Sequence, residues 1–142
     1  MKAIICKKFA PVSDLVWEEV ADPVAGPGEV VVDIKAAGLN YPDNLIVQGL
    51  YQFQPERPFS PGHEGAGVVS SVGEGVDMHS VGDSVAFFKG FGAFAEKCYL
   101  RRWHSQFLKA FLSTPQLVFL WFMAQAIMPL YKGRASTRMM KF

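Results

Sequence analysis

Short apolar runs separated by glycine and proline turns are the feature that most limits how the first hundred residues of this chain can fold. The clearest turns are Pro27-Gly28 and Gly73-Glu74-Gly75. Runs of this length at this spacing are typical of the strands of β-barrels and β-sandwiches. The predicted strands cover residues 2–8, 15–20, 29–37, 67–72, 83–88 and 92–100. The sequence therefore predicts a mainly β fold.

One segment between the predicted strands has helical character. Residues 41–49, YPDNLIVQG, carry a proline near the first helical position and end in a glycine. Leu45 and Ile46 are spaced to face inward together. We predict one short helix inserted between strands. Because half of the 142 residues are hydrophobic and 19% are charged, the chain can bury one good core.

The net charge of +1 conceals two unlike parts of the chain. Up to Glu96 there are 6 Lys or Arg residues against all 13 Asp and Glu, whereas from Lys97 onward there are 8 basic residues and no acidic one. We predict a folded unit over residues 1–100 and an apolar, basic tail over residues 101–142 that is helical or disordered. The chain has two distant cysteines and no secretory signal pattern, which favours a reduced, cytoplasmic setting.

Several short motifs follow one another within residues 26–96. They are GPGEV at 26–30, AGLNYPD at 37–43, GLY at 49–51, PGHEGAG at 61–67, VGDSV at 81–85 and GAFAE at 92–96. In order and spacing they resemble the catalytic domain of the medium-chain dehydrogenase/reductase superfamily, most closely its zinc-free quinone oxidoreductase branch. The resemblance implies a GroES-like, partly open β-barrel over residues 1–100.

The His63-Glu64 pair raises the question of a metal site. A catalytic zinc usually takes three protein ligands, and neither the two cysteines nor the two other histidines stand at ligand spacing. Zinc-dependent members of the superfamily carry a cysteine ligand where this chain has Asn40. We therefore expect no zinc. His63 would then fix the Pro-Gly turn, and Glu64 would bind a neighbouring cation or pair locally.

The resemblance also implies which residues line a substrate cleft. In zinc-free relatives the residue at the Asn40 position lies near the nicotinamide, and aromatic residues shape the pocket. By that resemblance Asn40, Tyr51 and His63 are the catalytic candidates, and Asn40 and Tyr41 are the cofactor-binding candidates. An amide suits a carboxamide or a ribose hydroxyl, and a tyrosine offers a flat face to a quinone or enone. Two alternatives stay open: Asn40 caps the helix, and the tyrosines are merely half-buried.

Hydride transfer in this superfamily requires a nucleotide-binding domain with a glycine-rich turn between a strand and a helix. Residues 90–95, GFGAFA, fit G-x-G-x-x-A formally, but the next residues read as a strand and no acidic residue follows to hold a ribose. We predict that this chain lacks the nucleotide-binding domain. Since the tail also loses the resemblance abruptly, we expect a truncated or frameshifted gene product.

The tail permits other interpretations. Residues 110–131 carry no charge and are long enough to span a bilayer, which would make them a tail anchor, although two prolines and two glutamines weaken that reading. A nucleic-acid-binding tail is disfavoured because its charges cluster at the two ends around an apolar centre.

Two classes of function remain. The first is the catalytic-domain half of an NADPH-dependent quinone or activated-alkene oxidoreductase, inactive by itself. The second is a non-enzymatic GroES-like binding module, with or without attachment to a membrane through residues 110–131.

Overall fold

A computed structural model describes residues 1–101 and 106–109 of the chain. Its strands are β1 (Lys2–Ile5), β2 (Val16–Glu19), β3 (Glu29–Ala37), β4 (Glu64–Val72), β5 (Ser84–Phe88), β6 (Lys97–Arg101) and β7 (Gln106–Lys109). Its helices are the one-turn 3-10 helix η1 (Val12–Asp14) and the α-helix α1 (Tyr41–Val47). A mainly β fold with one short inserted α-helix is thereby confirmed for the described part of the chain.

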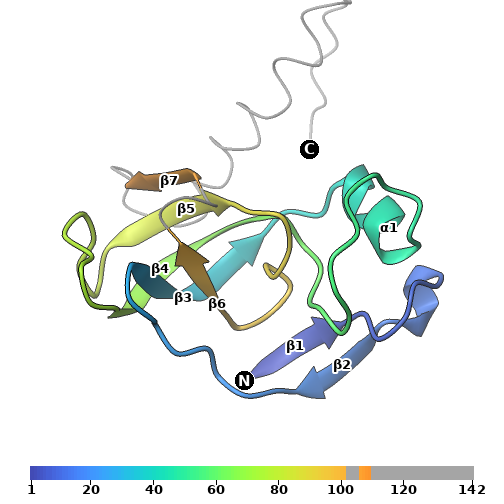
Figure 1. Cartoon of the computed structure of the whole chain (residues 1–142), viewed down its shortest axis with the longest axis horizontal. Helices are drawn as coiled ribbons and strands as arrows, with labels where there is room; N and C mark the ends of the chain where they lie inside the picture. Colours follow the sequence, from blue (N-terminus) through green and yellow to red (C-terminus); the bar gives the residue numbers. More distant parts are fainter. Residues whose placement is uncertain (102–105, 110–142) are drawn as a thin grey trace, which may run out of the picture.

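The strands form two antiparallel sheets (Figure 1). The larger has the order β6-β3-β4-β5-β7, and β1 and β2 form a separate pair. Single bridges join Ala3 of β1 to Ala95, just before β6, and Cys6, just after β1, to Phe59 in the segment before β4. The two sheets are therefore connected through β1.

Some element boundaries differ from the sequence prediction. The strand expected at residues 67–72 begins three residues earlier, at Glu64, and the strand expected from residue 92 begins only at Lys97. Glycines in residues 62–67 lowered the apparent strand propensity of the first segment. In the second segment, the apolar residues 93–95 favoured a strand where the chain forms a loop. Helix α1 lies inside the predicted range of residues 41–49.

The main core lies on one face of the larger sheet. Alternate residues of β3, among them Val30 and Val32, are buried against Val69 of β4, Phe87 of β5 and Leu100 of β6. This period of two is what places one face of each strand in the core. A second cluster, made of Cys6, Ile46, Val47 and Phe59, fastens α1 to the segment that follows β1.

The pairing of β3 with β4 depends on glycine. A Cβ built at Gly67 would overlap the backbone carbonyl oxygen of Asp33, and one built at Gly73 would overlap that of Gly26. The register between these strands also shifts at two places, Val31/Val32 and Ile34/Ala36. The glycines of the PGHEGAG segment therefore allow close backbone approach at an irregular crossing.

The described residues of the predicted tail are Arg101, which ends β6, and residues 106–109, which form β7. Residues 106–109 pair with β5, so that this short piece is a strand and not a helix. The proposed bilayer-spanning residues 110–131 lie outside the described residues. Within the described part, no helix has the length and apolar character needed to cross a membrane.

The close approach at Gly67 leads to a stability prediction. Gly67→Ala should lower the free energy of unfolding by about 3 kcal/mol, because the added methyl must push the β3 backbone away. Urea denaturation measures the loss. Gly26→Ala is the matched control, since its Cβ would meet only the flexible end of the Glu29 side chain. Equal losses in the two variants would contradict the account.

Candidate functional site

The candidate site forms where the loop after β3 meets the segment before β4. The register pairs Ala37 with Gly65, so that Gly38 lies against Glu64, and the Gly38 amide donates to the Glu64 carbonyl oxygen at 3.2 Å. Two residues further along, Asn40 is the N-cap of α1. This backbone pairing brings two motifs that are far apart in sequence, AGLNYPD and PGHEGAG, into contact.

Asn40 and Glu64 make the first hydrogen bond of the site. The Asn40 side-chain nitrogen donates to Glu64 Oε1 at 2.6 Å. Glu64 is only 1% exposed, and a Cβ at residue 38 would overlap its carboxylate. Glycine at position 38 therefore makes room for a buried acid, and that acid orients the Asn40 amide. Of the two roles expected for Glu64, local pairing is the one observed.

Asp43 and His63 make the second hydrogen bond of the site. Asp43 Oδ1 lies 2.8 Å from His63 Nδ1, and the aspartate is 3% exposed. The other carboxylate oxygen, Oδ2, accepts a hydrogen bond from the Asn40 backbone N–H at 2.9 Å. An acid three residues after the N-cap that bonds back to its amide is half of a capping box. One buried carboxylate thus both begins α1 and holds the histidine.

The environment of His63 favours its charged form. The hydrogen bond that the His63 ring donates to Asp43 raises the pKa of His63, and the negative charges of Asp43 and Glu64 act in the same direction against the opposing effect of burial. The ring also packs edge-on against Phe88, with centroids 5.0 Å apart. Because Nδ1 faces Asp43, and no described residue bonds Nε2, the second nitrogen is the one left for a ligand.

The two tyrosines do not join this hydrogen-bonded group. Tyr41 is the first residue of α1 and is 73% exposed. Tyr51 is half-buried against the cluster of Ile46 and Phe59. Tyr51 is therefore half-buried, as one of the two alternatives expected. Asn40 is the N-cap of the helix, as the other alternative expected. The catalytic and cofactor roles assigned to these residues stay predictions.

The sequence reasoning missed Asp43 as a site residue. A signal was present: Asn-x-x-Asp at residues 40–43 has the spacing of a capping box, and it stands directly before an apolar helical run. That spacing fixes the contact with Asn40 but says nothing about His63, which comes 20 residues later.

Neither a metal site nor a pyrophosphate-binding turn is formed by the described residues. Among the described residues, no group of three or more His, Cys, Asp or Glu side chains is placed to hold a metal ion, and the absence of zinc stays a prediction. Residues 90–95 lead into β6, a strand, so that they do not form the strand-to-helix turn that binds a pyrophosphate.

The described fold and site define a β domain with one capped helix set against a Pro-Gly-His-Glu turn. The family model of the alcohol dehydrogenase GroES-like domain matches residues 26–113. The chain belongs to this family, and the predicted resemblance to the GroES-like domain of the medium-chain dehydrogenase/reductase superfamily is confirmed. The match ends beyond residue 100, and the predicted domain boundary there stays a prediction.

Relatives include quinone oxidoreductase-like proteins, VAT-1 homologues and alcohol dehydrogenases. Quinone oxidoreductase-like protein 2 of Rattus norvegicus is 39% identical over 97 residues, which are 68% of this chain and 27% of that protein. A crystal structure of a probable oxidoreductase from Mycobacterium abscessus is 43% identical, with a TM-score of 0.68 over 74% of this chain and 33% of that one. The crystal structure of Escherichia coli quinone oxidoreductase complexed with NADPH is 27% identical, with a TM-score of 0.72. The match covers 88% of this chain and 40% of that one. The chain thus spans less than half the length of these relatives.

The His63 contact predicts a pH dependence. A histidine whose pKa is raised on folding stabilises the protein below its unfolded pKa of about 6.5, and this contribution is lost as the pH rises through the folded pKa. The free energy of unfolding in urea should therefore fall between about pH 6 and pH 8. His63→Gln should remove that fall and His79→Gln should keep it. An unchanged slope in His63→Gln would refute the assignment.

The Asn40 contact predicts a cost in stability. Asn40→Ala should lower the free energy of unfolding by about 2 kcal/mol, because the Glu64 carboxylate loses its hydrogen-bond donor while it stays buried. Adding Glu64→Gln should recover part of the loss. Asn44→Ala is the control, since that side chain only accepts a hydrogen bond from Gln48, the C-cap residue of α1. A loss in Asn40→Ala no larger than in the control would disprove the role of the contact.

Proposed function

We propose that the chain is the catalytic-domain half of an NADPH-dependent oxidoreductase that reduces quinones or activated alkenes. The observation that carries the proposal is the linked set Asn40–Glu64 and Asp43–His63, which holds an oriented amide and a histidine that favours its charged form next to each other. The family and the quinone oxidoreductase relatives support it.

The residues present suit one end of the cofactor. An amide held by a buried acid and an exposed aromatic ring on the same helix, Asn40 and Tyr41, offer hydrogen bonds and a stacking face to a nicotinamide. NADPH, when bound, supplies the hydride. Its phosphates and riboses would need further residues, because the described part of the chain has no strand-to-helix glycine turn.

In the proposed reaction, His63 completes the reduction by donating a proton. Hydride addition to a quinone or enone leaves negative charge on oxygen, which a neighbouring acid must neutralise. A charged imidazole can donate from Nε2 while Asp43 retains Nδ1 and stabilises the ring in either state. Asn40 orients the reacting partners, and Tyr51 lies close enough to the α1 cluster to shape the acceptor side.

We expect the 142-residue chain alone to show no measurable quinone-dependent oxidation of NADPH. A few nicotinamide contacts without a nucleotide domain should give millimolar binding, on the order of 4 kcal/mol. Fusing the nucleotide domain of a relative should restore activity, and Asn40→Ala or His63→Gln in that fusion should lower kcat about a hundredfold. The Asn44→Ala fusion is the control. Activity of the unfused chain at ordinary enzymatic rates would overturn the proposal.

A second candidate is a non-enzymatic GroES-like binding module. It rests on the described residues alone, which form the GroES-like β domain and contain no glycine-rich strand-to-helix turn. In that case the fusion with a nucleotide domain would bind NADPH but would not reduce a quinone, and the site substitutions would have no effect on function.

The proposal assigns no metal to the chemistry. Asn40 is a weak zinc ligand beside thiolate and imidazole, and its side-chain nitrogen is engaged by Glu64. Purified protein dialysed against zinc should hold no stoichiometric metal by elemental analysis. One tightly bound zinc per chain that is lost in His63→Ala would contradict this expectation.

A further inference from the structure

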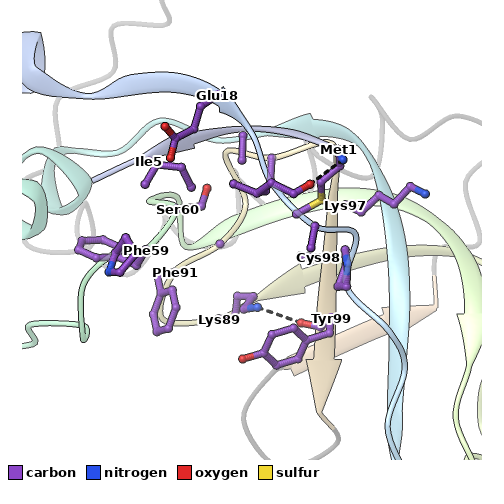
Figure 2. A pocket seen from close by; sticks show the side chains of 17 residues that line it. Met1, Ile5, Glu18, Phe59, Ser60, Lys89, Phe91, Lys97, Cys98 and Tyr99 are labelled. Carbon is purple, nitrogen blue, oxygen red and sulfur yellow. Dashed lines mark hydrogen bonds between the residues drawn. The ribbon is translucent and has the colours of Figure 1, made fainter. Parts of the chain in front are cut away.

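A pocket of about 370 Å³ lies away from the residues of the candidate site. None of Asn40, Asp43, His63 and Glu64 lines it. Its walls come from β1, β2, the segment at residues 58–60, the loop at residues 89–92 and β6 (Figure 2). A cavity of this volume is in the range that holds small organic ligands.

The walls are mostly apolar. Ala3, Ile5, Phe59 and Ala95 are buried residues that line the pocket, and the aromatic ring of Phe91 extends into the same lining (Figure 2). The Ser60 hydroxyl is buried there without a hydrogen-bond partner. Such a surface favours the apolar body of a ligand and leaves one hydroxyl available for a polar atom.

Three charged side chains line this pocket, and two of them are already paired. Glu18 binds Lys7 at 2.6 Å, and Lys97 binds Asp22 at 2.6 Å. Only Lys89 has no carboxylate within ion-pair distance among the described residues. The net unpaired charge of the lining is therefore positive and is located at Lys89.

The Lys89 ammonium makes only one hydrogen bond to another described residue. Its ammonium donates to the Tyr99 carbonyl oxygen at 2.9 Å and lies 4.5 Å from the centre of the Tyr99 ring and 5.9 Å from that of Phe91 (Figure 2). An ammonium has three donors, so hydrogen bonds remain for a ligand. Lys89 is half-buried, and burial lowers its pKa, so that its charged form is less favoured than in water. A bound anion would relieve that cost.

We propose that this pocket binds a small monocarboxylate with an apolar body, whose carboxylate pairs with Lys89 and whose body packs between Ile5, Phe59 and Phe91. The assignment follows from one unpaired ammonium at the edge of an otherwise apolar cavity. A neutral ligand would leave that charge unmatched, and a dianion would bring a second charge against apolar walls. The site is independent of the reaction proposed above.

Phenylacetate is a suitable probe, and phenylacetamide is its neutral counterpart of the same shape. Isothermal titration of the full chain should give a Kd of about 1 mM for phenylacetate. Lys89→Met should weaken binding about tenfold, because it keeps the apolar stem and removes the charge. Lys89→Arg should retain binding.

Lys97→Met is the matched control, since it removes an equal charge from the same lining but from a lysine already held by Asp22. Its Kd should stay within about twofold of the parent. Amide chemical shifts of residues 89–92 and 99 should move on titration and report both the location and an intact fold. Equal weakening in Lys89→Met and Lys97→Met, equal affinity for phenylacetamide, or no binding of phenylacetate at about 20 mM would each overturn the proposal.

Discussion

The antiparallel pairing of β3 with β4 is the interaction on which the candidate site depends. These two nine-residue strands contribute to the main core, and the candidate site forms at their ends. Because Ala37 pairs with Gly65, the chain leaving β3 passes directly beside the residues that enter β4. Asn40 therefore meets Glu64, and Asp43 meets His63, without any contribution from a distant element. Glycines at residues 38 and 67 are what allow the backbones and the buried acid to come so close.

That geometry explains why a domain of this kind can hold two buried carboxylates. Asp43 and Glu64 are almost inaccessible to solvent, and each accepts hydrogen bonds from Asn40 or faces His63. A buried acid without such partners would be strongly destabilising. Under the proposed function Asn40 would serve both folding and turnover, so that the effect of replacing it on turnover has to be compared with its effect on folding.

Much of this organisation follows from the sequence. The β character, the short helix at residues 41–47 and the family resemblance come directly from the spacing of apolar residues, turns and motifs. The role of Asp43 does not, because a capping-box spacing describes a local contact, whereas its bond to His63 depends on strand register. The start of β4 was also missed, since glycine-rich sequence has weak strand propensity even where the sheet requires it. The pocket beside Lys89 is formed by five separate segments, and no local pattern could indicate it.

The central claim is that Asn40 and His63 face the reacting end of a nicotinamide. A crystal structure of the chain fused to the nucleotide domain of a relative, with NADPH bound, tests it most directly. The account predicts the nicotinamide carboxamide or its ribose within hydrogen-bond distance, about 3 Å, of the Asn40 side chain, with His63 Nε2 facing the acceptor space. A nicotinamide bound with well-defined density away from Asn40 and His63 would contradict it.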